Sequence, residues 1–107
     1  MCQSEIIIQE LASLATEEKR QVLPRFFKTG KGEYGEGDKF LGVVVPSTRI
    51  VAKRHKDTPL DELSSLLLSE WHEARLCALL IMVEQLNIMI MYLIVLILVL
   101  LTILLMN

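Results

Sequence analysis

Residues 58–85, TPLDELSSLLLSEWHEARLCALLIMVEQ, decide the fold class. Thr58 and Pro59 followed by two acidic residues predict a helix start, because a hydroxyl N-cap, a proline in the first turn and negative charge all suit the N-terminal end of a helix. Ser69 is the expected cap of a second helix over residues 70–85. Two helices joined by so short a turn lie antiparallel, so the stretch predicts a helical hairpin.

The hairpin is too apolar to stand alone. Its first helix carries one stripe of leucines at helical spacing, made by Leu60, Leu63, Leu66 and Leu67. Residues 76–83 in its second helix, LCALLIMV, are apolar on every side and must be covered from more than one direction. Stacked antiparallel helix pairs meet this need, and they are the unit of helical solenoids. We therefore expect an all-α fold of antiparallel helix pairs, a partial solenoid with a hydrophobic C-terminal helix.

Three further helices are predicted before the hairpin. Apolar residues at three- and four-residue spacing predict the first over residues 4–15, with Ser4 as its N-cap. A hydroxyl followed by two acids predicts the second over residues 16–27. Glycines break the helical pattern in residues 29–39, and a proline then begins a helix over residues 46–53.

Charge divides the chain into two parts. All 11 Lys and Arg and all 13 Asp and Glu lie at or before Glu84, so the net charge of −2 belongs to the first part. We expect a helical-repeat segment at residues 1–85 and a hydrophobic tail at residues 86–107. A net charge near zero gives no reason to expect nucleic-acid binding by the chain as a whole, although one face can still be basic.

No cofactor and no metal ion is expected. Cys2 and Cys77 lack the paired spacing of a disulfide framework or a zinc site, so both are predicted to be free thiols in a reducing compartment. The sequence at His72 begins like a zinc-protease helix, but the position of the second ligand is Leu76, and the motif fails. Residues 30–35 match G-x-G-x-x-G without the preceding strand that a dinucleotide site requires.

The one candidate ligand surface is basic. Arg49 and Lys53 lie one helical turn apart, and Lys56 follows at similar spacing. Arg54 belongs to the same cluster, which Arg25, Lys28 and Lys31 would extend. Positive side chains on one face are what contact with a phosphate backbone requires. A solvated helix face has the same pattern and is the commoner explanation, and His55 is assigned to a solvated helix end.

Residues 25–43, RFFKTGKGEYGEGDKFLGV, form the most specific stretch. Together with Val45-Pro46, Arg49, Ala52-Lys53, Ser69-Glu70-Trp71-His72-Glu73, Arg75 and Ala78-Leu79, they resemble the N-terminal part of the DNA alkylation repair family of helical-repeat DNA glycosylases. The resemblance implies HEAT-like helix pairs that hold duplex DNA on a basic concave face, with Arg49 and Lys53 as DNA-backbone contacts. The resemblance leads us to expect a basic residue at position 44, but the residue there is Val44.

The resemblance also implies a reaction. Family members excise cationic N3- or N7-alkylated purines by hydrolysing the glycosidic bond, and an aspartate in a Trp-Asp context stabilises the positive charge that develops on the sugar. That segment is expected after Gln85, yet no acidic residue follows Glu84 and no tryptophan follows Trp71. We therefore expect a family member truncated before its catalytic aspartate, without catalytic residues and inactive.

The hydrophobic tail has three explanations. Residues Ile88 to Met106 nearly suffice to cross a hydrocarbon layer of roughly 30 Å at about 1.5 Å per residue. The flanks suit a membrane span poorly, because the nearest cation along the sequence is Arg75. Codons for Leu, Ile, Val and Met share a T at the second position, so a slipped reading frame can produce such a run. A frameshift or truncation product is the leading hypothesis, ahead of a membrane anchor and of a buried partner helix.

A different class of function follows if the tail is an anchor. The chain would then be a non-enzymatic, tail-anchored helical module that interacts with membranes or other proteins. Its location would be the membrane, whereas the family resemblance implies the cytoplasm. A third outcome is an unstable fragment, because helical repeats without their neighbours would leave residues 76–83 uncovered.

Overall fold

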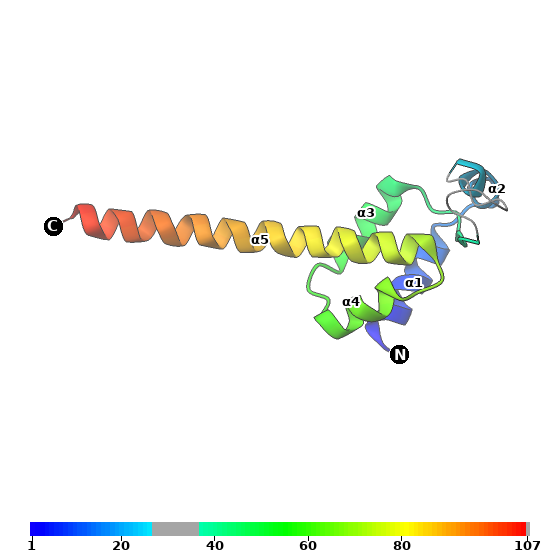
Figure 1. Ribbon diagram of the computed structural model, residues 1–107, viewed down its shortest axis with the longest axis horizontal. Coiled ribbons are helices and arrows are strands. Elements are labelled where there is room, and N and C mark those ends of the chain that lie inside the picture. The colour runs from blue at the N-terminus through cyan, green and yellow to red at the C-terminus, as the bar shows by residue number, and fades with distance from the viewer. Residues whose placement is uncertain (27–36, 107) are drawn as a thin grey trace.

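A computed structural model describes residues 1–26 and 37–106, except for the side chains of residues 25 and 26. The described residues form five helices and no strand: α1 (Gln3–Ser13), α2 (Glu17–Phe26), α3 (Val45–Arg54), α4 (Leu60–Leu67) and α5 (His72–Leu105). The predicted all-α class and the long apolar C-terminal helix are both confirmed. Helices α1, α3 and α4 gather around the first half of α5, whose second half projects away from them (Figure 1).

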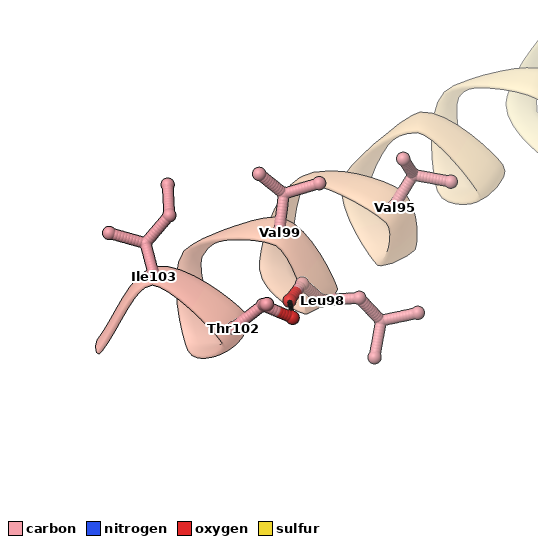
Figure 2. A pocket seen from close by; sticks show the side chains of 5 residues that line it. All are labelled: Val95, Leu98, Val99, Thr102 and Ile103. Carbon is pink, nitrogen blue, oxygen red and sulfur yellow. Dashed lines mark hydrogen bonds between the residues drawn. The ribbon is translucent and has the colours of Figure 1, made fainter. Parts of the chain in front are cut away.

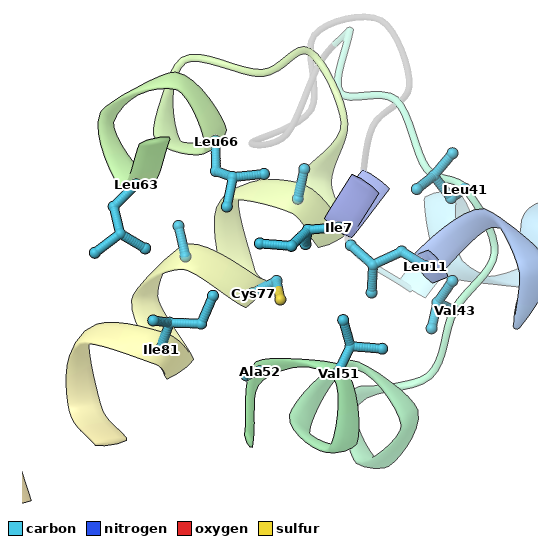
Figure 3. Packing of buried hydrophobic residues seen from close by; sticks show 12 residues of the cluster. Ile7, Leu11, Leu41, Val43, Val51, Ala52, Leu63, Leu66, Cys77 and Ile81 are labelled. Atoms are coloured by element: carbon cyan, nitrogen blue, oxygen red, sulfur yellow. The ribbon is translucent and has the colours of Figure 1, made fainter. Parts of the chain in front are cut away.

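The core lies where α1, α3 and α4 meet α5 (Figure 3). On α5 the buried apolar residues recur at helical spacing, and two of them are alanines, which let neighbouring helices approach closely. The members are Ile7, Leu11, Leu41, Val43, Val51, Ala52, Leu63, Leu66, Ala74, Cys77, Ala78 and Ile81. Helices α1, α3 and α4 therefore form one packed unit with the first half of α5.

The predicted hairpin is formed by α4 and the first part of α5. Leu60, at the start of α4, lies in one groove with Leu86 and Met89, which stand far along α5. The two helices therefore run antiparallel. HEAT-like repetition of such pairs stays a prediction.

Two of the predicted helix starts are wrong in detail. Ser4 lies inside α1, where its backbone N–H donates to Glu62 Oε2 at 2.8 Å, and Cys2 occupies the N-cap position. Thr58 does not cap α4, because its hydroxyl donates to the carbonyl oxygen of His55, and Pro59 is the N-cap residue. In both places the hydroxyl residue has a partner outside the helix that it was expected to begin.

The second helix of the hairpin also differs from its predicted range of 70–85. It begins at His72, after Trp71, whose N–H donates to Ser69 Oγ at 3.2 Å. It does not end at Gln85, because α5 continues unbroken to Leu105. The composition boundary near residue 86 is therefore not a helix boundary.

Residues 76–83 are only partly covered. Cys77, Ala78 and Ile81 are fully buried, whereas Leu79 and Val83 are half exposed. Helices α3 and α4 both pack on α5, and a third side stays open. The expected uncovered apolar face is thus present, although it is narrower than the whole stretch.

Candidate nucleic-acid interface

The outer face of α3 carries the two predicted DNA contacts, Arg49 and Lys53. Both side chains are exposed, while Thr48, Val51 and Ala52 bury the opposite side of the helix. Arg49 and Lys53 are separated by one helical turn, so they share a face as expected. None of the acidic side chains in the described part of the chain forms an ion pair with either. Two unneutralised cations therefore stand on one solvent-facing surface.

The chain entering α3 is held by Glu73, a buried carboxylate on α5. One carboxylate oxygen accepts the backbone N–H of Leu41 at 2.9 Å, and the other accepts those of Gly42 and Val43 at 2.9 and 3.0 Å. Only 1% of Glu73 is exposed. Hydrogen bonds to a charged acceptor are stronger than neutral ones, so this three-amide clamp fixes where α3 begins.

The same segment is held from the other side by the turn between α1 and α2. The backbone N–H of Thr16 donates to the carbonyl oxygen of Gly42 at 3.0 Å. Gly42 has a φ of 98°, and a Cβ atom there would lie 2.6 Å from Thr16 O and 2.8 Å from the backbone nitrogen of Arg20. Only glycine fits this position, because both the backbone conformation and the space exclude a side chain.

The other end of α3 is held by Glu10 of α1. Its carboxylate lies 2.6 Å from Arg54 Nη1 and 2.6 Å from His55 Nε2. Burial opposes the ionisation of Glu10, but the hydrogen bonds and positive charges of His55 and Arg54 outweigh it and lower its pKa. The expectation of a solvated His55 is wrong, and Arg54 points to Glu10 instead of joining a basic cluster.

Lys56 lies in the turn after α3, which ends at Arg54, and lines a hollow with Ile88 and Tyr92 of α5. The side-chain amide of Gln85 donates to the carbonyl oxygens of Lys56 and Thr58 at 2.9 and 2.8 Å, which fastens this turn to α5. The structure thus brings together Arg49 and Lys53 from the predicted cluster and places Lys56 elsewhere. Lys28 and Lys31, the side chain of Arg25 and the glycine motif of residues 30–35 lie outside the described part of the chain.

A polar cluster surrounds the first turn of α5. Asp38 accepts hydrogen bonds from Arg75 and, at 2.9 Å, from His72 Nδ1, and the His72 ring stacks on Phe40 with 4.5 Å between ring centroids. Burial opposes the ionisation of Asp38, yet its bonds to Arg75 and His72 outweigh this effect and lower its pKa. His72 is the first residue of α5, and Trp71 before it packs partly buried against the core.

Two buried groups of α5 that could act chemically, Cys77 and Glu73, have structural roles. Cys77 is a free thiol buried among apolar side chains, where burial and then the charge of Glu10 raise its pKa to about 12. A thiol with such a pKa supplies almost no thiolate nucleophile at neutral pH. Glu73 is surrounded by the amides that it binds. The cations on the outer face of α3, unpaired among the described residues, are therefore an arrangement that can bind a polyanion.

Glu73 was not recognised as important in the sequence, although a signal was present. It lies in register with Cys77 and Ile81, so an acidic residue occupies the buried stripe of a helix. A carboxylate in that position requires hydrogen-bond donors, and the glycine-containing segment at 41–43 supplies them.

Comparison with known proteins gives one family. The sequence model described as DNA alkylation repair enzyme matches residues 7–92, which is most of the chain and extends beyond Gln85 into the charge-free part of α5. Neither a curated protein nor a solved structure matches the chain.

Proposed function

Because this chain belongs to the DNA alkylation repair enzyme family, we propose that its helical segment binds the backbone of duplex DNA through Arg49 and Lys53. The observation that carries the proposal is an exposed pair of cations on a helix held at both ends, by Glu73 and by Glu10. A surface fixed before binding loses little freedom when a ligand docks. Phosphate contacts of this kind position a protein on DNA without reading its sequence.

The substrate class proposed from the family resemblance is duplex DNA with alkylated purines, held by HEAT-like helix pairs. We propose that these 107 residues bind it without excising a base. The acids nearest the expected catalytic segment are Glu73 and Glu84, and Glu73 is already occupied by three backbone amides. No Trp-Asp pair occurs in the sequence, so the carboxylate to which the family resemblance assigns the stabilisation of the sugar cation is missing.

Removing one cation from α3 should weaken DNA binding and make it less sensitive to salt. We expect Arg49→Ala and Lys53→Ala each to reduce affinity for a duplex roughly tenfold near 0.1 M salt, and to lower the slope of log K against log salt by about 1, because one phosphate contact is lost. Fluorescence anisotropy of a labelled duplex, with the full chain in mild detergent, measures both quantities.

The matched control for these variants is Lys39→Ala. It removes the same charge, but Lys39 is paired with Glu70 at 3.1 Å, so its loss should leave the affinity and the salt slope almost unchanged. Equal effects from Lys39→Ala and Arg49→Ala would show that net charge alone drives binding, and would overturn the assignment to α3.

The purified chain should release no free base from alkylated DNA. We expect 3-methyladenine and 7-methylguanine to stay at the level of the protein-free sample, because the sequence lacks the Trp-Asp carboxylate. Liquid chromatography with mass detection measures the released bases, and brief heating of the same DNA in acid provides the positive control. Release that rises with protein concentration and disappears in Glu84→Gln would contradict the prediction and identify Glu84 as the acid.

A further inference from the structure

The second half of α5 has no protein partner within the described part of the chain. Each residue from 93 to 101 is between 49% and 58% exposed. Nine consecutive helical residues cover every side of the cylinder, so no side is more protected than another. This helix is long and apolar enough to cross a membrane, and its apolar window is 0% buried.

We infer that residues 88–105 of α5 insert into the hydrocarbon layer of a lipid bilayer, with Lys56 at the headgroup boundary and Tyr92 one helical turn inside it. These 18 helical residues span about 27 Å, close to the roughly 30 Å of a bilayer core. The inference goes beyond DNA binding and does not depend on it, since it uses neither Arg49 nor Lys53.

The fold supplies the boundary cation that the sequence appeared to lack. The nearest cation before the tail in sequence is Arg75, but the structure places Lys56 in one hollow with Ile88 and Tyr92. The hydrogen bonds from Gln85 to the Lys56 turn keep this lysine beside α5. A lysine extends its amine to the headgroups from an apolar surface, and a tyrosine one turn inside the boundary can direct its hydroxyl to the same region.

The threonine inside the proposed span has its hydroxyl satisfied within α5. Thr102 Oγ1 donates to the carbonyl oxygen of Leu98 at 2.8 Å, so its hydroxyl needs no water or partner (Figure 2). The hollow beside Thr102 is a surface groove, and its lining residues, between Val95 and Ile103, all come from α5 (Figure 2). Backbone groups of a continuous helix bond to one another, which is the requirement for crossing hydrocarbon.

A bilayer fits this helix better than a second copy of the chain. A helix that pairs in water has one apolar stripe and a polar remainder, whereas α5 is apolar on all sides after Asn87. Helices that pair within membranes approach through small residues, and the sequence has no Gly, Ala or Ser after Ala78. Lipid covers every side at once, so it is the occupant that the exposure pattern favours.

The first test is flotation of the full chain with vesicles of phosphatidylcholine, followed by an alkaline carbonate wash. We expect the chain to float and to resist the wash. Introducing Leu96→Lys together with Leu100→Lys should reduce the bound fraction at least roughly tenfold, because charges at the bilayer centre are costly. The matched control is Leu14→Lys with Leu68→Lys, two exposed leucines outside α5, and this variant should bind vesicles as well as the original chain.

The second test measures depth and the boundary. With Trp71→Phe as background, Ile97→Trp should be quenched most by lipids brominated near the acyl-chain end, and Tyr92→Trp by lipids brominated near the headgroup. Lys56→Ala should lower affinity for vesicles containing phosphatidylglycerol about fivefold, and Lys39→Ala should leave it unchanged. Arg49→Ala should keep full vesicle binding, which separates this inference from the DNA proposal.

Three results would overturn the inference. The first is a chain that stays at the bottom of the gradient as a defined oligomer whose residues 93–101 are protected by a second copy. The second is equal flotation of the Leu96→Lys, Leu100→Lys variant and the original chain. The third is equal quenching of Ile97→Trp and Tyr92→Trp at every bromine depth, which would place the helix along the surface instead of across the layer.

Discussion

Glu73→Ala should lower the free energy of unfolding of the helical unit by about 3–5 kcal/mol. The substitution leaves the buried N–H groups of Leu41, Gly42 and Val43 without their acceptor, and each such loss costs about 1–3 kcal/mol. The free energy of unfolding of a small domain is only about 5–15 kcal/mol in total, so much of the unit should unfold at moderate temperature. Thermal unfolding of the full chain in mild detergent, followed by the fluorescence of Trp71, measures the loss.

The matched control is Glu70→Ala, three residues away on the surface. Glu70 is exposed and pairs only with Lys39 among the described residues, so its loss should cost no more than about 1 kcal/mol. The cost of Glu73→Gln should lie between those of Glu70→Ala and Glu73→Ala. Its amide oxygen still accepts a hydrogen bond, but its NH₂ group faces a backbone donor. Equal costs for Glu70→Ala and Glu73→Ala would show that the clamp contributes nothing.

Helix existence was predictable from sequence because periodicity reports which side of a helix is apolar. Helix ends were less predictable, because Ser4 and Thr58 use their capping positions for contacts with distant parts of the chain. Ser4 N–H reaches Glu62, and the Thr58 hydroxyl accepts from Gln3 Nε2 at 3.0 Å. Both contacts join the starts of α1 and α4, which only the packed fold brings together.

The candidate interface was predictable in part for the same reason. Arg49 and Lys53 lie one turn apart on one helix, so helical spacing alone places them on a shared face. Arg54 and His55 were assigned wrongly because their partner, Glu10, is 44 and 45 residues away in sequence. Such long-range pairing leaves no local pattern, and it changes which cations remain available to a ligand.

The contact of Lys56 with the hydrophobic tail was also hidden in the sequence, because the two are far apart along the chain. Along the sequence, the charge-free stretch has no nearby cation, which counts against a membrane span. In space, the turn after α3 carries Lys56 to the point where α5 leaves the packed unit. The boundary residue of the proposed span therefore comes from a turn outside the helix that it borders.

Gly42→Ala should be the second severe substitution, with a cost of about 2–5 kcal/mol. Its φ of 98° is strained for any residue with a side chain, and the new methyl group would meet the backbone of Thr16 and Arg20 instead of a flexible side chain. Relief requires α2 to move, which breaks the hydrogen bond from Thr16 to Gly42. The same fluorescence-detected unfolding of the full chain gives the cost.

Gly37→Ala separates the two causes of that cost. Gly37 also has a positive φ, of 81°, but nothing lies within 4 Å of the added methyl group, so this variant carries backbone strain of about 1–2 kcal/mol without a clash. The difference between the two glycine variants therefore measures how closely the α1–α2 turn packs on the segment that enters α3. If the two cost the same, α2 is not held against Gly42, and the segment is fixed by Glu73 alone.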